Sequence, residues 1–202
     1  VQYAVNRTTP EQFLRVRGRC ETRELEMNFE PTGDQAMIAE AFSRFFDEHS
    51  SMARVRAAMP SGFDAELWRE FAAMGGFGTR VAEDQGGTGL GVFDACLLME
   101  EAGRMLASGP IAEGIVAART LAACGGAGAD LLGRLLEGEA VVTLALHDAA
   151  ATPSQWIAGG AVADAVIALD SDALYLVEPT AAEKQLIPNL ATTPLAIVPL
   201  HS

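Results

Sequence analysis

Apolar residues between Thr32 and about Gly138 recur every three or four positions, which is the spacing of amphipathic helices. Thr32 with Gln35 resembles a capping box, and Pro110 suits the first turn of a later helix. The pattern predicts five helices: one from Thr32, one from the N-cap Asp64 to Gly75-Gly76, one over 92–107, one from Pro110 to Gly125-Gly126, and a short one that contains Leu131 and ends at Gly138.

The pattern changes after Glu139 to short runs rich in β-branched and aromatic residues, separated by turn residues. AVVTLAL, DAVIALD and ALYLVE predict three strands, with a hairpin at Ser171-Asp172, and LAIVPLHS predicts one more. We therefore expect an α+β fold: a poorly structured extension over 1–26, an all-α helical domain over 27–138, and an incomplete antiparallel β domain over 139–202. Met27 is a candidate natural start.

The charge balance narrows the classes of partner. Fourteen Lys and Arg against 27 Asp and Glu give a net charge of -13, which disfavours nucleic acid and anionic membrane surfaces. Three cysteines form no CxxC pair, and no apolar run reaches transmembrane length. These features predict a cytoplasmic protein with reduced thiols.

The spacing of the residues excludes most candidate motifs for nucleotide binding, metal binding or catalysis. The glycines at 86, 87, 89 and 91 match neither GxGxxG nor a P-loop, and instead favour a tight turn entering a helix. The three histidines have no partners at metal-ligand spacing, so no metal site is predicted. Glu100 and Glu101 lie about 100° apart on a helix, which favours a solvated or salt-bridged face over a shared catalytic site.

The residues Phe77-Gly78 and the stretch VAEDQGGTGLGVFDACLLMEEAGR (81–104) resemble the N-terminal domain of the acyl-CoA dehydrogenases. An MNFEPTGDQ-type start and the LWREFAAMGGFG helix precede them in the order usual for that family, so the resemblance covers about Met27 to Gly138. It implies a helical domain, a middle β domain and a C-terminal four-helix bundle, of which the third is absent from this chain.

The resemblance also implies an activity: FAD-dependent α,β-dehydrogenation of an acyl-CoA thioester, in which a glutamate removes the α-proton and hydride passes to flavin N5. That glutamate lies in the C-terminal bundle of the family, so no residue of this chain is predicted to be catalytic. The implied partners are an acyl-CoA substrate, an electron-transfer acceptor protein, and further acyl-CoA dehydrogenase subunits in a homo- or hetero-oligomer.

Four further positions match the family's cofactor contacts by resemblance. Trp156, Ile157 and Ala158 match a W-I-T segment that lies against the isoalloxazine, and His147 stands where the family has the Thr of a Thr-Glu-Pro flavin-binding segment. A core aromatic is the alternative for Trp156. Ile111, Ala112 and Ile115 match positions that face the acyl chain, and ordinary helix packing is the alternative for each.

His147, Asp148 and Ala149 stand where the family has Thr-Glu-Pro, and the Gly-Ser that follows in the family is missing. This degenerate segment resembles that of heteromeric members, which act on bulky substrates such as steroid side chains and in which one chain type has lost flavin contacts. The leading hypothesis is therefore an acyl-CoA dehydrogenase polypeptide that is incomplete on its own. The rivals are a non-catalytic partner subunit and an unrelated helical binding module.

Overall fold

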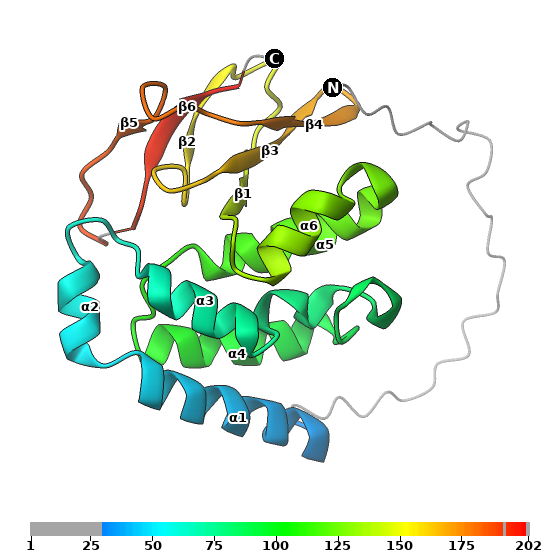
Figure 1. The fold of residues 1–202 in the computed structure, drawn as a ribbon, viewed down its shortest axis with the longest axis vertical. Helices are drawn as coiled ribbons and strands as arrows, with labels where there is room; N and C mark the ends of the chain where they lie inside the picture. Colours follow the sequence, from blue (N-terminus) through cyan, green and yellow to red (C-terminus); the bar gives the residue numbers. More distant parts are fainter. Residues whose placement is uncertain (1–29, 192, 201–202) are drawn as a thin grey trace, which may run out of the picture.

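The computed structural model describes residues 30–191 and 193–200, in which helices come first and short strands follow (Figure 1). The extension over 1–26, Met27 and His201 lie outside the described residues. The helices are α1 (Gly33–His49), α2 (Met52–Ala58), α3 (Ala65–Ala73), α4 (Val92–Arg104), α5 (Ile111–Cys124) and α6 (Ala129–Leu136), with 3₁₀ turns η2 (Gly76–Arg80), η3 (Glu83–Gln85) and η4 (Gly125–Ala127).

Side-chain caps explain where three helices begin. The predicted capping box of α1 is confirmed: Thr32 Oγ1 accepts from the Gln35 N–H at 3.3 Å, and the Thr32 N–H donates to Gln35 Oε1 at 2.9 Å. Asp64 caps α3, as predicted, by accepting from the N–H of Leu67 at 3.0 Å. The short helix α2 was not predicted, and it begins at the N-cap Ser51.

The glycine-rich stretch between α3 and α4 is a tight turn that leads into a helix, as predicted. The Gly87 N–H donates to the Ala82 carbonyl at 3.0 Å, and the Gly89 N–H donates to the Val81 carbonyl at 2.7 Å. A Cβ at position 87 would collide with the carbonyl oxygens of Val81 and Gly78, so only glycine fits there.

The strands form two three-stranded sheets. The first has the order β1 (Val142–Leu144), β3 (Ala165–Asp170), β4 (Ala173–Val177), and the second has the order β2 (Ser154–Ile157), β6 (Ala196–Pro199), β5 (Gln185–Leu186). The hairpin at Ser171-Asp172 is confirmed, with a φ of 57° at Ser171. The α+β fold is confirmed, although β1 and β3 run parallel because the chain passes through β2 in the other sheet between them.

One apolar core joins the helices to the first sheet. Phe46, Phe71 and Phe77 are fully buried at its centre, and Val142 of β1 and Ile167 of β3 belong to the same cluster. A smaller apolar cluster is formed by residues of both sheets, among them Ile157 of β2, Val198 of β6 and Val166 of β3. Figure 1 shows the strands gathered on one side of the helical layer, with α5 and α6 beside them.

Several apolar residues of the helical portion, Met37 on α1 among them at 62%, are exposed instead of buried. Met74 is the C-cap of α3 and is 44% exposed, and Val116 on α5 is 52% exposed. The predicted helix over 92–107 ends at Arg104, because the chain then takes a left-handed residue at Leu106, where φ is 54°.

Candidate functional site

The α4–α5 loop, residues 105–110, leads into two of the three predicted acyl-facing residues, which begin α5. Ile111 and Ala112 line a hollow of about 170 Å³ with Met99 and Leu106. Ile111 is buried, at 4% exposure, whereas Ala112 is exposed. Ile115 does not line this hollow and is 3% exposed in the core, which matches its alternative interpretation as a packing residue.

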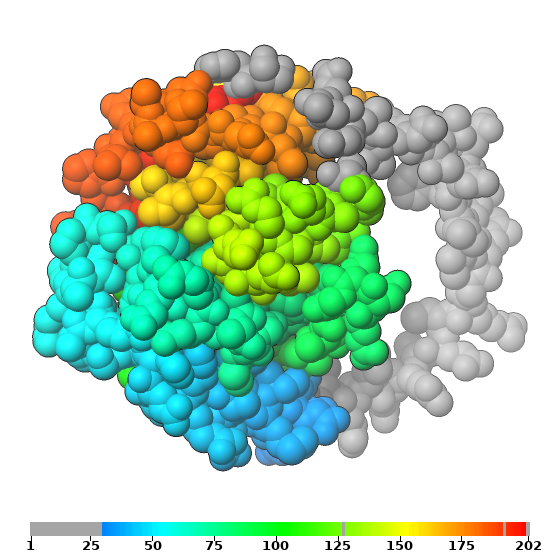
Figure 2. Space-filling view, in the orientation of Figure 1, coloured from blue at the N-terminus to red at the C-terminus, as the bar shows by residue number. Residues whose placement is uncertain are grey.

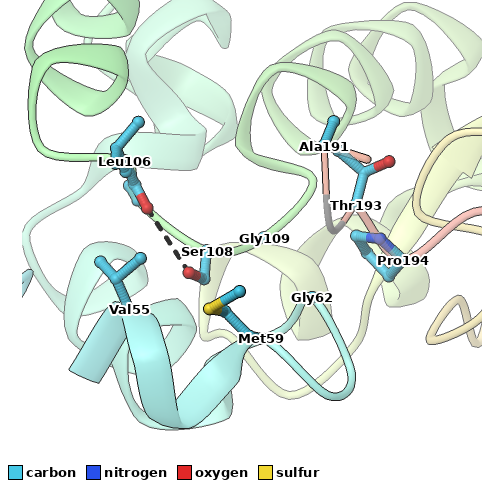
Figure 3. A pocket seen from close by; sticks show the side chains of 10 residues that line it. Val55, Met59, Gly62, Leu106, Ser108, Gly109, Ala191, Thr193 and Pro194 are labelled. Atoms are coloured by element: carbon cyan, nitrogen blue, oxygen red, sulfur yellow. Dashed lines mark hydrogen bonds between the residues drawn. The ribbon is translucent and has the colours of Figure 1, made fainter. Parts of the chain in front are cut away.

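A second hollow of about 340 Å³ opens on the other side of the same loop. Figure 3 shows Val55 and Met59 directed from α2 and its end toward the loop, with Thr193 and Pro194 across from them. Among the described residues that line it, none is charged, and its few polar groups include the Ser108 hydroxyl, which donates to the Leu106 carbonyl at 3.4 Å. We call this hollow the α2 groove.

The α2 groove and the hollow at Ile111 are neighbours, because Leu106, Ala107 and Gly109 line both. The left-handed conformation of Leu106 is uncommon for a branched residue, and it turns the loop between the two hollows. The Asp64 N–H donates to the Ser108 carbonyl at 2.9 Å, which fixes the loop to the start of α3.

A charged cluster holds α2 against α3. Arg54 donates to both carboxylate oxygens of Asp64, from Nε at 2.8 Å and from the second guanidinium nitrogen at 2.9 Å, and to Glu70 Oε2 at 2.9 Å. Burial by itself would raise the pKa of the Asp64 carboxyl, but the hydrogen bonds from Arg54 and from the Leu67 and Glu66 N–H groups outweigh it and hold that pKa below 3.8.

The EEAGR end of α4 is a salt-bridged face, as the sequence predicted. Arg104 donates to Glu101 Oε2 at 2.7 Å, to Asp47 Oδ1 at 2.9 Å and to Ser43 Oγ at 3.0 Å. These contacts join α4 to α1, while Glu100 stays exposed. The motif therefore has a structural explanation in this chain, and its two glutamates do not form a site.

The segment after β1, where resemblance places flavin contacts, is closed by its own hydrogen bonds. Gln155, which is 3% exposed, accepts from the His147 N–H at 3.1 Å and donates to the carbonyls of His147 at 2.7 Å and Thr152 at 3.0 Å. The Ala149 N–H donates to the Leu169 carbonyl at 2.8 Å. The His147 backbone is therefore occupied, and its side chain is exposed.

Asp148 completes this closure. Its carboxylate accepts from the Ala150 N–H at 2.8 Å and from the Ser171 N–H at 3.0 Å, which ties the segment to the β3–β4 turn. Both amides are then unavailable to a phosphate or a flavin carbonyl, and the carboxylate adds negative charge.

The W-I-A segment is divided between the two faces of β2. Trp156 is 68% exposed on the outer face, so its alternative interpretation as a core aromatic is wrong, whereas Ile157 is 1% exposed. Ala158 has no hydroxyl, and its carbonyl accepts from Thr143 Oγ1 at 2.6 Å. The exposed indole of Trp156 would suit stacking on a planar ring. The backbone groups of the segment from His147 to Gln155, however, are already hydrogen-bonded within the chain, so they do not fit a bound flavin.

Sequence reasoning placed Asp148 at the Glu position of the flavin segment, but it missed Gln155 and the hydrogen bonds by which both residues close this segment. The only available signal is that Gln155 stands at an inward position of the strand SQWI, where a polar side chain needs internal partners. Among residues 30–191 and 193–200, no group of three or more His, Cys, Asp or Glu is arranged to hold a metal ion. None of the helices described has the length and apolar character needed to cross a membrane.

The helical layer with a small β layer packed on α5 agrees with the fold that the sequence resemblance implies. The family model described as "Acyl-CoA dehydrogenase, N-terminal domain" matches residues 32–139, which is more than half of the chain. The chain belongs to the acyl-CoA dehydrogenase family.

Comparisons with individual proteins agree with this family assignment. The chain is 31% identical over 147 residues to "Acyl-CoA dehydrogenase IpdE2" of Mycobacterium tuberculosis, covering 71% of this chain and 44% of the relative. It is similar to the solved structure "Tcur3481-Tcur3483 steroid ACAD G363A variant", with a TM-score of 0.67, 25% identity, and coverage of 82% of this chain and 54% of that one.

A third likeness shows the fold alone. The "ChsE4-ChsE5 complex from Mycobacterium tuberculosis" matches with a TM-score of 0.66 at 22% identity, covering 86% of this chain and 55% of that chain. The chain thus spans about half the length of the relatives that it matches.

Proposed function

We propose that this chain takes part in FAD-dependent α,β-dehydrogenation of an acyl-CoA thioester, as one portion of a larger acyl-CoA dehydrogenase assembly. The observation that carries the proposal is the largely apolar hollow at Ile111 and Ala112, which lies at the predicted acyl-facing positions and has one charged lining residue, Glu113. Apolar lining with few polar groups is typical of pockets for such ligands.

In this proposal the chain supplies a wall of the acyl site, not the reacting groups. Removal of an α-proton requires a base and stabilisation of negative charge on the thioester oxygen in a dry pocket. Both would come from a part of the assembly that this chain does not contain. We further propose a division at 138/139 between its helical and β portions, and a cytoplasmic location with an electron-transfer protein as acceptor.

The substrate proposal is an acyl group with a bulky or fused-ring end. Its support is the likeness to a structure described as a steroid ACAD, together with the largely apolar space around the α4–α5 loop. That structure contains two proteins by its description, Tcur3481 and Tcur3483, and this supports a hetero-oligomer.

A second candidate function is a non-catalytic partner subunit of a heteromeric acyl-CoA dehydrogenase. The closed segment from His147 to Gln155 favours it, because the backbone groups that would hold flavin are already paired within the chain. Under this proposal a complete partner chain would hold the FAD.

Acyl-CoA binding tests the proposal directly. Calorimetric titration of the purified chain with butyryl-CoA should give saturable binding. Ala112→Trp should weaken it because the ring would fill the hollow, whereas Val116→Trp, on the same helix but outside the lining, should leave it unchanged. Absence of binding by the wild-type chain, or equal effects of the two variants, would count against an acyl site here.

Flavin spectra separate the two candidates. The chain should be purified alone and with a complete dehydrogenase chain, and its flavin absorption and acyl-CoA-dependent bleaching recorded. A colourless chain that joins a yellow, bleaching complex supports the partner subunit. A chain that is yellow and bleaches by itself supports the enzyme, and flavin in no mixture contradicts both.

A further inference from the structure

Strand β4 is an outer strand of the first sheet and carries no residue that would block strand pairing. Its sequence is ALYLV (173–177), without charge or proline, and among the described strands it pairs only with β3, in an unbroken register. The unpaired N–H and C=O groups of such an edge can bind a strand of another chain. Figure 2 shows the residues that follow β3, in orange, at the surface on the side of the molecule away from α1.

The backbone groups of Leu174 and Leu176 point out of this sheet. Opposite them in the register lie Leu169 and Ile167, whose carbonyls accept from N–H groups on the β1 side at 2.8 and 2.9 Å. Opposed residues of an antiparallel pair either bond to each other or both turn away. Leu174 and Leu176 therefore direct their N–H and C=O groups to the open edge, where no described residue bonds to them.

Both faces of β4 are already covered within the chain. Leu174 and Leu176 pack against the helical core, and Tyr175 packs against the smaller apolar cluster, to which Val177 belongs. The open side of the strand is therefore its edge. An added strand would continue the sheet and place its alternate side chains beside these two clusters.

Acidic residues at the two ends of β4 select the partner. Asp172 precedes the strand, Glu178 follows it, both are exposed, and the whole chain has a net charge of -13. If two copies paired antiparallel with Tyr175 opposite Tyr175, Asp172 of one would lie opposite Glu178 of the other, and like charges in that position are destabilising. Lys or Arg at the ends of a foreign strand would be favourable there.

We propose that the edge of β4 is an interaction surface that binds an extended segment of a different protein chain, one whose apolar residues are flanked by Lys or Arg. Main-chain hydrogen bonds to Leu174 and Leu176 supply the affinity, and the charges at the two ends supply the specificity. This surface is separate from the proposed acyl site, whose lining contains no residue of β4.

Amide hydrogen exchange of the intact chain, followed by NMR, tests the proposal. The probe is the peptide Lys-Lys-Val-Thr-Val-Lys-Lys, which is as long as 172–178, and its control is Glu-Glu-Val-Thr-Val-Glu-Glu. With the basic peptide, exchange of the Leu174 and Leu176 amides should slow about fivefold or more, because they become hydrogen-bonded. The Tyr175 amide, which faces β3, should change little, and the acidic peptide should slow neither leucine.

A pair of charge reversals tests the selection by charge. Glu178→Lys should weaken binding of the basic peptide about threefold, because an attraction at the strand end becomes a repulsion. Glu100→Lys reverses an exposed charge on α4 and is the matched control, which should leave that binding unchanged.

Three results would contradict the proposal. Slowing of the leucine amides by neither peptide would show that the edge does not bind a strand. Equal slowing by both peptides, or an unchanged affinity in Glu178→Lys, would show that charge does not select the partner. If both amides exchange slowly without peptide and the chain sediments as a dimer, a second copy occupies the edge instead.

Discussion

At the residue scale, the glycine loop between α3 and α4 depends on one position. Gly87→Ala would push a Cβ into the Val81 and Gly78 carbonyls, whose own hydrogen bonds to Gly89 and Thr88 prevent an easy shift. We expect a loss of about 1–3 kcal/mol in the free energy of unfolding. Urea denaturation measures it.

Gly133→Ala is the matched control for this substitution. A Cβ at Gly133 meets nothing within 4 Å, and the residue lies inside α6, so alanine should stabilise by about 0.5–1 kcal/mol. Equal effects of the two substitutions would show that the carbonyl collision is not what requires glycine at position 87.

The Arg54 cluster makes a prediction about pH. Because the folded-state pKa of Asp64 is held below 3.8, the ionised carboxylate contributes stability above that pH, and the contribution disappears as pH falls through the folded-state value. Arg54→Met should cost about 1.5–3 kcal/mol at pH near 7. The difference from wild type should narrow as pH falls below about 4.

Urea unfolding of both proteins across a pH series checks this expectation. Arg44→Met is the control, because its contact with Glu40 at 3.7 Å is largely exposed and should contribute little at any pH. A wild-type–Arg54→Met difference that stays constant from neutral to acid pH would show that packing of the arginine side chain, not its charge, stabilises α2.

At the element scale, Tyr175 of β4 connects the two sheets. Its hydroxyl donates to the Leu200 carbonyl just after β6, at 2.6 Å. Burial, with Asp170 and Asp148 nearby, raises the pKa of this phenol above 10.0. The neutral hydroxyl is therefore the stabilising form: its contribution is present below pH 10.0 and is lost as pH rises through the folded-state pKa.

Tyr175→Phe should lower the free energy of unfolding by about 0.5–1.5 kcal/mol at neutral pH and should reduce the loss of stability in alkali. Chemical denaturation at neutral and alkaline pH measures both effects. An unchanged alkaline transition in the variant would assign that transition to other groups.

Elements with strong local signals were predictable, and short ones were not. Thr32 and Gln35 fixed the start of α1 because their contacts are within one turn. Helix α2 has only seven residues and depends on Arg54 reaching Asp64 and Glu70, ten and sixteen residues away. Strands β2 and β5 likewise exist through pairing with β6, which follows both in the chain.

The same contrast holds for the candidate site. The hollow at Ile111 and Ala112 lies at positions that the resemblance singled out, because the helix that carries them follows the EEAGR stretch. The α2 groove could not, since its lining comes from α2, the α4–α5 loop and residues near Pro194, which only the fold brings together. The closure by Gln155 could not be predicted either, because it depends on where the fold places the His147 N–H and the carbonyls of His147 and Thr152.

At the scale of the whole molecule, the helices and the first sheet share one core. α5 packs on β1, and Val142 and Ile167 lie in the same apolar cluster as Phe71 and Phe77. A fragment ending at Gly138 would lack β1, so the face of α5 that packs on β1 would be exposed to solvent. We therefore expect the helical and β portions to unfold together, although the sequence changes character between them.

Heating should give a single transition whose calorimetric and van't Hoff enthalpies agree. Val142→Ala, at a fully buried strand position, should destabilise by about 1–3 kcal/mol and shift the Trp68 fluorescence of the helical portion as much as the far-ultraviolet circular dichroism. A Trp156→Phe background removes the second indole. Val92→Ala, 63% exposed, is the control and should change stability by no more than about 0.5 kcal/mol. If Val142→Ala destabilised the strands while Trp68 kept its transition, the portions would unfold separately, and the acyl-site wall could then form without the β layer.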